Sequence, residues 1–334
     1  MRRIIIGTRA SKLAMIQTNW VIERLRQRWP HLEVAIEHVR TTGDHITDKP
    51  LSQIGGDGVF VAEIECALRD GRIDLAVHSL KDLPTIQPEG VRVIIPGPRE
   101  DVRDVLVSTI SMQLTAEGLR SSVAGELLSP SLRFGTVSLR RAAQLRALLP
   151  DVQILPIRGN VDTRLRKLAA GDYDAIMLAS AGLHRLAMQP EIGHHMLYFP
   201  ADQVLPAPGQ GALGLEIRDE PAVRALVEPL GDPEVLASVS AERMFMRRLG
   251  AGCYLPVAAY GNLREGQLTL RGLVISLDGR QQVRVERSVA WHPGMDIAIA
   301  EQLGSELAVQ ALERGASTII QEVNVTRTQE HQHV

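Results

Sequence analysis

Long apolar runs, cysteines and aromatic residues are all scarce in this chain of 334 residues. Its longest uninterrupted apolar run is the five residues Ala175–Ala179, whereas a membrane helix needs about 20. The basic N-terminus is followed by only three apolar residues, fewer than a secretory signal needs. Two cysteines are too few for a disulfide scaffold. We therefore expect a soluble, cytoplasmic protein without a membrane partner.

An excess of positive charge is also missing. The chain has 37 basic and 39 acidic residues, a net charge of −2, and only 3% of its residues are aromatic. We therefore expect no nucleic-acid partner, because neither a basic surface nor stacking platforms are present. Lysine is rare, at four residues against 33 arginines. Two explanations of this ratio are open. One is codon bias, and the other is a need for arginine side chains that bind carboxylates through two donors.

Strand and helix patterns alternate along the first two thirds of the chain. Ser11 is a candidate N-cap for a helix reaching Leu25, because the apolar spacing there is near 3.6 residues. Such alternation predicts βαβ units and an α/β fold, with residues 74–79 and 91–95 as buried parallel strands. The other predicted strands are 4–6, 33–39, 153–157, 175–179 and 212–217. The other predicted helices are 60–70, with Phe60, Ile64, Ala67 and Leu68 on one face, and 140–149.

Two local patterns occur twice. The turns 71–74 and 171–174 both join a helix to a strand, and the turns 7–11 and 135–138 both precede a helix. Either match alone fits chance, but two matches in the same order favour a duplicated α/β lobe. Two such lobes enclose a cleft, and ligands of open α/β sheets bind beyond the strand C-termini. Helix N-termini there attract anions.

The pattern changes after Pro229. Helices are predicted at 235–249 and 297–314, and strands at 268–275 and 283–290, around a turn at Asp278 and Gly279. Residues 205–209 resemble a hinge or crossover. We expect domain 1 at 1–100 and 208–228, domain 2 at 101–207, a smaller α/β domain 3 at 229–322 and a disordered polar tail at 323–334.

Two familiar motifs fail on their context. Residues 209–214 match the dinucleotide fingerprint G-x-G-x-x-G, but a proline-rich segment precedes them and a strand, not a helix, is predicted to follow. His194, His195, His331 and His333 have no cysteine or carboxylate at ligand spacing. We therefore expect neither a nucleotide nor a metal site.

The first set of residues that carries chemistry is 78–84, His-Ser-Leu-Lys-Asp-Leu-Pro. It follows a predicted strand at the end where α/β sites lie. Asp82 beside Lys81 is suited to proton transfer or to stabilising a cation. The alternative is an ordinary solvated strand exit.

A second set gathers arginines and hydroxyl groups at strand exits and helix starts. Arg158 follows the predicted strand 153–157, and Ser138 stands near a helix start. Arg9 and Ser11 occupy the matching places in the other lobe. Both lobes would then present cations to a polyanionic ligand. The alternative, arginines on helix surfaces, suits Arg146 and Arg166 but not Arg158.

The third set surrounds Cys253, which lies between glycines and a proline. This setting predicts an accessible loop thiol, either a nucleophile or an attachment point. A bystander thiol is the alternative. No histidine is near in sequence, which argues against a protease-like Cys–His pair. Cys66 falls in a helical pattern and is predicted to be a small core residue.

Together and in this order, these sets resemble the porphobilinogen deaminase (hydroxymethylbilane synthase) family. The resemblance covers about residues 3–320. It rests on eight segments in sequence: 7–14, 55–60, 78–84, 99–104, 135–141, 158–165, 205–211 and 250–256.

The resemblance implies an α/β fold of three domains. The first two are a periplasmic-binding-protein-like (type II) pair with a cleft, and the third carries the cofactor cysteine. Cys253 would hold a dipyrromethane through a thioether. Four porphobilinogen units would be joined head to tail with release of ammonia, and water would release hydroxymethylbilane. This transferase reaction belongs to tetrapyrrole biosynthesis, and the family suggests a monomer.

The resemblance also implies a role for each matching residue. Asp82 would be the catalytic carboxylate, and a lid at 41–58 would cover the cleft. Besides Cys253, the implied cofactor-binding residues are Lys81, Thr136, Ser138, Arg140 and Arg141. The implied substrate-binding residues are Arg9, Ser11, Phe60, Arg158, Arg164 and Arg185.

The lid departs from the family pattern. Asp57 and Gln53 stand where the family commonly has lysine. A less basic lid leaves open a paralogue with altered specificity. The two lobes and the arginines leave open a second alternative, a two-lobed carboxylate-binding protein without covalent chemistry.

Overall fold

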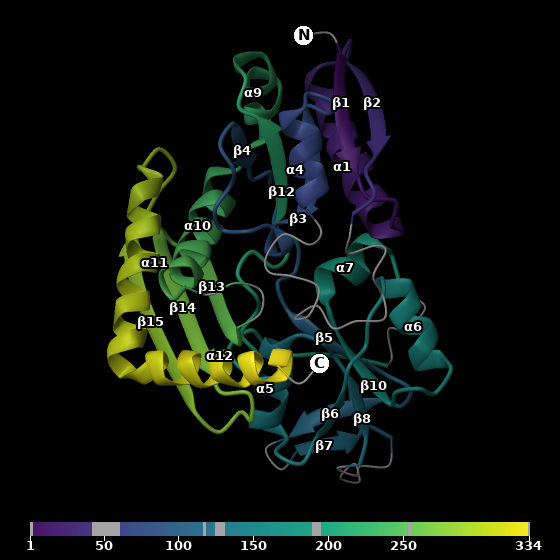
Figure 1. The fold of residues 1–334 in the computed structure, drawn as a ribbon, viewed down its shortest axis with the longest axis vertical. Helices are drawn as coiled ribbons and strands as arrows, with labels where there is room; N and C mark the ends of the chain where they lie inside the picture. The colour runs from purple at the N-terminus through teal and green to yellow at the C-terminus, as the bar shows by residue number, and fades with distance from the viewer. Residues whose placement is uncertain are drawn as a thin grey trace.

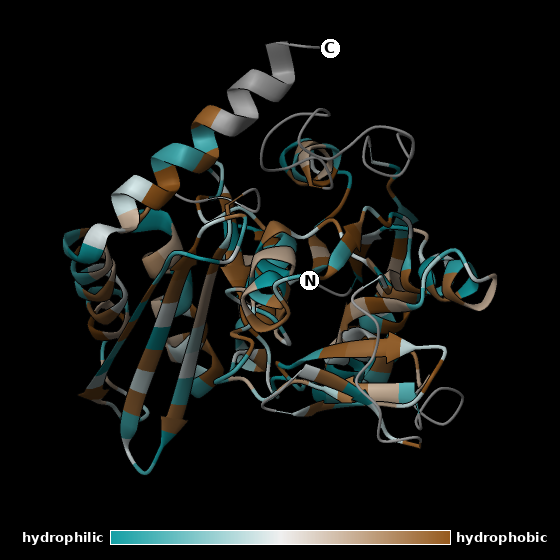
Figure 2. Cartoon of the chain, turned by 90° about the horizontal axis from the view of Figure 1, so that it is seen from below, coloured by the Kyte–Doolittle hydropathy of each residue, from teal (hydrophilic) through white to brown (hydrophobic). Residues whose placement is uncertain are grey.

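The computed structural model describes residues 3–41, 61–115, 118–123, 131–188, 195–250, 252 and 255–332. Two α/β lobes and a third α/β unit lie side by side (Figure 1). The central strands are largely hydrophobic, as buried strands must be (Figure 2). No helix in the described part is long and apolar enough to cross a membrane.

The first lobe is built on a five-stranded sheet of order β2-β1-β3-β12-β4. Strands β1, β2 and β3 are parallel, and β12 runs antiparallel to both β3 and β4. The strands are β1 Arg3–Thr8, β2 Glu33–His38, β3 Leu75–Ser79, β4 Val91–Ile94 and β12 Leu213–Arg218, and the helices are α1 Lys12–Arg28, α4 Ala62–Arg69 and α9 Pro221–Val227. Strand β4 therefore runs in the same direction as β3, but the prediction that residues 91–95 pair as a parallel strand is wrong, because β12 lies between β3 and β4 and pairs antiparallel with both.

The second lobe has a sheet of order β11-β5-β10-β8-β9. Its strands are β5 Asp104–Ser108, β8 Arg133–Gly135, β9 Gln153–Leu155, β10 Ala175–Ala179 and β11 Met196–Tyr198. Its helices are α5 Leu139–Leu148, α6 Val161–Ala169 and α7 Ser180–Arg185. A hairpin of β6 Met112–Thr115 and β7 Gly118–Ser121 is attached to it.

The two sheets share one topology. Strands β2, β1, β3, β12 and β4 correspond in order and direction to β9, β8, β10, β5 and β11. In each lobe the antiparallel strand, β5 or β12, arrives after a crossing from the other lobe. The prediction of a duplicated α/β lobe is confirmed. Because both crossings lie side by side between the lobes, they bring residues 96–103 and 199–212 together.

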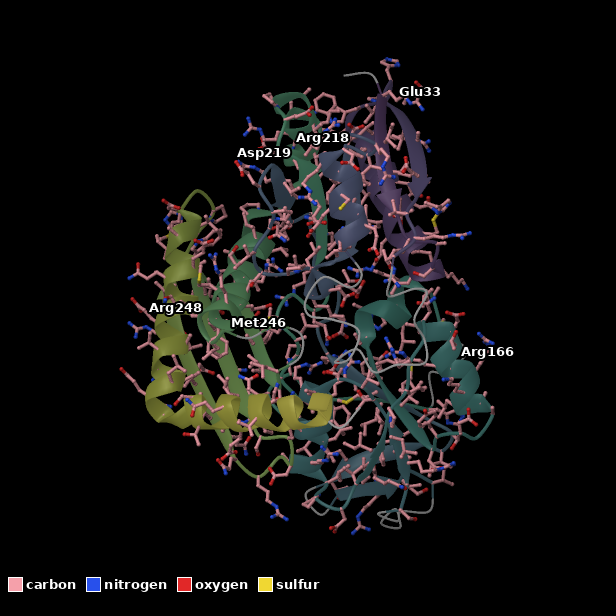
Figure 3. All side chains as sticks on the ribbon, in the orientation of Figure 1. Glu33, Arg166, Arg218, Asp219, Met246 and Arg248 are labelled. Atoms are coloured by element: carbon pink, nitrogen blue, oxygen red, sulfur yellow. The ribbon has the colours of Figure 1, made fainter. Side chains whose placement is uncertain are left out.

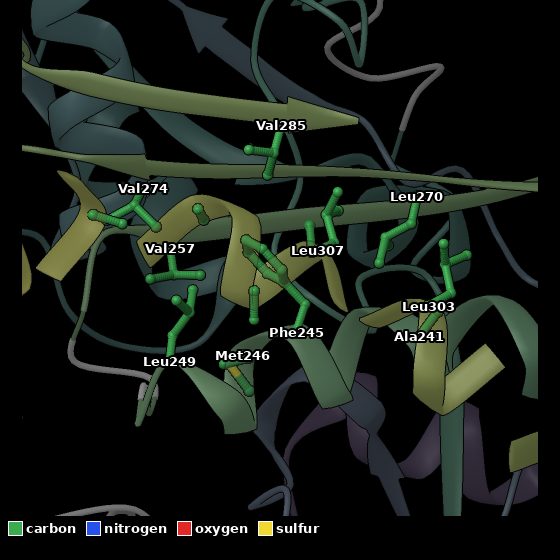
Figure 4. Packing of buried hydrophobic residues seen from close by; sticks show 14 of the residues in the cluster. Ala241, Phe245, Met246, Leu249, Val257, Leu270, Val274, Val285, Leu303 and Leu307 are labelled. Atoms are coloured by element: carbon green, nitrogen blue, oxygen red, sulfur yellow. The ribbon is translucent and has the colours of Figure 1, made fainter. Parts of the chain in front are cut away.

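The third unit is an antiparallel sheet of β13 Val257–Arg264, β14 Gln267–Ile275 and β15 Gln282–Ala290, covered by α10 Pro233–Arg248 and α11 Ile297–Ala311. Phe245 of α10 packs among Leu303 and Leu307 of α11 (Figure 4). A Cβ at position 272 would lie 2.4 Å from the Phe245 ring, so only glycine allows this contact.

Two sequence predictions need correction. The tail predicted to be disordered over 323–334 is helical through Gln332, in α12 Ser317–Gln332, which turns away from α11 near Gly315 at φ 97° (Figure 1). Cys66, predicted to be a core residue, is exposed on α4. Ile64, Ala67 and Leu68 form the buried face of that helix, and Cys66 lies about 200° around the axis from Ile64.

Candidate functional site

A cavity of about 400 Å³ lies between the lobes and reaches the third unit. Most of the predicted site residues line it: Arg9, Ser11, Lys81, Asp82, Thr136, Ser138, Arg140, Arg141, Arg164 and Arg185. Arg158 is not among the lining residues. Cys253, Phe60 and nearly all of the predicted lid at 41–58 lie outside the described residues. Gly252 and Leu255, on either side of Cys253 in sequence, line the cavity.

Asp82 and Lys81 stand on a single turn of 3-10 helix, Leu80–Asp82, directly after β3. Leu80 and Leu83 are fully buried and anchor this turn, while Asp82 is exposed. Lys81 Nζ donates to Gln210 Oε1 at 3.2 Å. Burial, and next the nearby Arg141 guanidinium, lower the pKa of Lys81 to about 8. The turn therefore offers a carboxylate beside a lysine whose charge is easily lost.

Three helices begin at the cavity wall. Ser11 caps α1 by accepting from Ala14 N at 3.3 Å, and Ser138 caps α5 by accepting from Arg141 N at 3.4 Å. Thr136 Oγ1 accepts from Ser138 N at 3.1 Å. Asn160, which precedes α6, makes no side-chain cap. Helix N-termini favour anions, so these ends reinforce the positive potential of the cavity.

Arg140 and Arg141 are buried and share one carboxylate, that of Asp104 on β5. Arg140 Nη1 lies 2.6 Å from Asp104 Oδ2, and Arg141 Nη2 lies 2.8 Å from Oδ1. Burial alone would raise the pKa of Asp104, but the two guanidinium groups hold it well below its usual range. Two cations on one anion leave a net positive charge at the cavity wall.

The remaining arginines are crowded in a poorly solvated place. Burial, then Arg141, lowers the pKa of Arg164 to about 10, and burial lowers that of Arg185 to about 10. Arg164 Nε donates to Gly159 O at 2.7 Å and Arg185 Nη2 to Gly211 O at 2.7 Å. Arg158 Nη1 is buried without a hydrogen-bond partner in the described part. Anionic oxygens of a ligand would stabilise these crowded cations and would accept a hydrogen bond from the unsatisfied donor.

Gln210 and Asp104 also belong to the site, although neither was predicted from the sequence. Gln210 is fully buried, and its Nε2 donates to Val102 O at 2.8 Å and to Asp104 Oδ1 at 3.0 Å. A Cβ at position 211 would lie 2.3 Å from Glu100 O, so the second glycine is needed for the two crossings to touch. The glycines on either side of Gln210 were the available signal. The segment after this motif is strand β12, as predicted, and not the helix that follows a dinucleotide fingerprint.

The fold and the cavity define a class: a mixed α/β protein with two lobes of the type II binding-protein topology around a cationic cleft, and a third unit beside it. A cleft of this kind takes a ligand with several carboxylates.

Comparison with known proteins specifies the family. Residues 4–224 match the family model "Porphobilinogen deaminase, dipyromethane cofactor binding domain", and residues 236–313 match "Porphobilinogen deaminase, C-terminal domain". The chain belongs to the porphobilinogen deaminase family. It is 45% identical to the porphobilinogen deaminase of Syntrophobacter fumaroxidans over 96% of this chain and 98% of that one. It is 47% identical to that of a Roseiflexus species over 90% and 95%.

Among solved structures, the periplasmic VFT2 domain of Bordetella pertussis BvgS aligns over 69% of this chain and 86% of its own, with a TM-score of 0.41 and 12% identity. The family matches establish the activity, porphobilinogen deamination and condensation to hydroxymethylbilane in porphyrin biosynthesis, with a dipyrromethane cofactor. They cover the third unit as well, which disfavours a simple two-lobed binding protein.

The residues present fit such a cofactor. Each of its pyrroles carries an acetate and a propionate, and the cavity offers crowded arginines and helix N-termini that can bind carboxylates. Gly252 and Leu255, which flank Cys253 in sequence, line the same cavity.

Proposed function

We propose that the chain is a hydroxymethylbilane synthase in which Asp82 is the catalytic carboxylate and Cys253 the attachment point of the dipyrromethane. One observation carries this proposal. Asp82, the cations of both lobes and the residues next to Cys253 in sequence line a single cavity. A chain anchored at Cys253 could therefore reach Asp82.

Asp82 would act on the incoming substrate. Loss of ammonia from porphobilinogen leaves a cation, and a carboxylate held beside it lowers the energy of that cation. The same oxygens would accept hydrogen bonds from pyrrole N–H groups, and a proton taken up from such a group would be relayed to the departing amine. When bound, the cofactor supplies the pyrrole carbon to which the first unit is joined.

The cations would hold the carboxylate side chains. We propose two sets of residues for this task. Toward the cofactor these are Lys81, Thr136, Ser138, Arg140 and Arg141, and toward the substrate Arg9, Ser11, Phe60, Arg158, Arg164 and Arg185. Arginine suits this task because its planar fork binds a carboxylate through two donors.

We also propose three domains: residues 1–100 with 208–228 form domain 1, residues 101–207 form domain 2 and residues 229–322 form domain 3. The insertion of β12 into the first sheet supports the split of domain 1. We further propose a cytoplasmic monomer. Light scattering on the purified protein tests the oligomeric state.

Intact-mass spectrometry tests the attachment. Protein made in a host that supplies porphobilinogen should carry the added mass of a dipyrromethane. Cys253→Ala should carry none, because no thiol remains at that position to form the thioether. Cys66→Ala is the matched control, since Cys66 is an exposed thiol on α4. Bare mass for the wild type, or loss of the adduct in Cys66→Ala alone, would contradict the proposal.

A further inference from the structure

One face of helix α10 joins the third unit to the first lobe. Val239 of this helix packs in an apolar cluster with Leu80 and Leu83, the two anchors of the Asp82 turn. Residues four apart on a helix lie on the same face, so Arg243 lies one turn beyond Val239. The turn that carries Asp82 is thus seated on a helix of another unit.

Arg243 binds the main chain of that turn. Its Nη1 donates to Leu83 O at 3.2 Å and to Leu80 O at 3.5 Å, and its Nη2 donates to Pro84 O at 2.5 Å. Nη2 also lies 3.4 Å from Gln87 Oε1. A guanidinium is the side chain that can serve carbonyl groups on both of its arms, because its donors form a rigid fork.

The neighbouring Glu242 fixes the same helix to the crossings between the lobes. It is fully buried and accepts from both arms of Arg99, at 2.7 and 3.0 Å. It also accepts from Gly209 N at 2.6 Å and from Gly261 N at 2.7 Å. Helix α10 is therefore held at the crossings and cannot slide freely relative to the turn.

The helix leads directly to the proposed attachment segment. α10 ends at Arg248, and Cys253 follows five residues later. Met246 lines the cavity, whereas Arg248 is exposed on the outer side of the helix (Figure 3). One rigid helix thus connects the place of Asp82 with the segment that contains Cys253.

We propose that Arg243 is a positioning residue for the reaction. By binding the carbonyl groups of Leu80, Leu83 and Pro84, it sets the position of Asp82 relative to the segment that carries Cys253. It acts through Asp82 and is not a lining residue of the cavity. This inference rests on the catalytic role proposed for Asp82.

The first test compares Arg243→Ala, Arg243→Lys and the control Arg248→Ala by melting temperature, intact mass, kcat and KM. We expect Arg243→Ala to keep its cofactor mass and KM while kcat falls by about tenfold to a hundredfold, because displacement of a catalytic group by about 1 Å can cost about a hundredfold. Arg243→Lys should restore only part of the lost kcat, since an ammonium group lacks the forked donors of a guanidinium. Arg248→Ala should match the wild type. If Arg243→Ala does not fold, Arg243→Lys carries the test.

A double-mutant cycle separates positioning from general destabilisation. Asp82→Glu keeps a carboxylate but moves it, which leaves a rate to measure. If Arg243 acts through Asp82, adding Arg243→Ala to Asp82→Glu should lower kcat by clearly less than it does in the wild type. Equal loss in both backgrounds, loss of the cofactor mass, or a wild-type kcat for Arg243→Ala would each overturn the inference. Wild-type activity of Asp82→Glu would instead count against the role of Asp82.

Discussion

At the scale of single residues, Lys81 has the most sensitive charge in the site. Burial first, then Arg141, lowers its pKa to about 8 from 10.5. Its ammonium is therefore partly lost just above neutral pH. Carboxylates bound nearby would oppose both causes, because they pair with the charged form.

We expect the pKa of Lys81 to rise when the cofactor is loaded. Competitive acetylation over a range of pH, read by peptide mass spectrometry, measures the neutral fraction of Lys81. The midpoint should lie near pH 8 in cofactor-free Cys253→Ala and at higher pH in the loaded enzyme. The same midpoint in both would contradict a carboxylate-binding role for Lys81.

Arg158 has a buried Nη1 without a partner in the described part. If a substrate carboxylate accepts a hydrogen bond from this nitrogen, Arg158→Gln should raise KM by about tenfold or more, since a charge-assisted hydrogen bond is lost. Initial rates over a range of porphobilinogen concentrations measure this. Arg166→Gln, on the exposed outer face of α6 (Figure 3), is the control and should leave KM unchanged. An unchanged KM for Arg158→Gln would remove Arg158 from the substrate site.

Residue types predicted part of the site. Arg158 and Asp82 stood out because each follows a strand, where α/β sites lie. Asp104 and Gln210 did not, because their importance lies in pairing across more than a hundred positions, with each other at 3.0 Å. No local pattern records such a contact. Cys66 is exposed for a different reason: cysteine is often buried, but here it lies on the side of α4 away from the buried Ile64, Ala67 and Leu68.

At the scale of elements, β5 and α5 are joined by a buried network of Asp104 with Arg140 and Arg141. Asp219, at the surface of the first lobe (Figure 3), also pairs with two arginines, Arg92 and Arg224, at 3.2 and 3.3 Å. The two sets differ mainly in burial, since Asp104 is fully buried and Asp219 is 32% exposed. They form a matched comparison of the same chemistry.

Asp104→Asn should lower the free energy of unfolding by about 3 kcal/mol or more, because it leaves buried guanidinium groups without a counter-charge. Asp219→Asn should lower it by less than about 1 kcal/mol. Urea titration measures both. The folded-state pKa of Asp104 is below its unfolded value, so its contribution is complete above the unfolded value and is lost as pH falls toward the folded value. Asp104→Asn should therefore show a weaker loss of stability on acidification, and equal effects of the two variants would be contrary to this expectation.

The elements themselves were predicted unevenly. The helix that follows Ser11 and the strand 175–179 were predicted with boundaries close to those observed. An N-cap and a helical periodicity mark the helix, and an uninterrupted apolar run marks the strand. Strand β5 was missed, although its five residues are all buried, because short apolar segments are ambiguous between strand and helix. The parallel pairing predicted for β4 was wrong because β12, which enters the sheet after the second lobe, lies between β4 and β3 and pairs antiparallel with both.

At the scale of the whole molecule, a duplicated topology produces the cleft. The repeat of short turns in the sequence was enough to predict two lobes, and the shared strand order confirms them. Strands β5 and β12 each enter their sheet after a crossing from the other lobe. The two crossing segments, 96–103 and 199–212, therefore meet between the lobes. The contacts of α10 with the Asp82 turn had no sequence signal, since Arg243 binds carbonyl groups that any residue provides.

The central claim is that Asp82 performs the chemistry on a chain anchored at Cys253. The most direct measurement is ammonia release from porphobilinogen by Asp82→Asn protein that has first been weighed intact. We predict that this variant carries the full cofactor mass and releases ammonia at less than about one hundredth of the wild-type rate, the scale of loss expected for a missing acid–base and charge-stabilising group. Near-normal ammonia release by the loaded variant would contradict the claim.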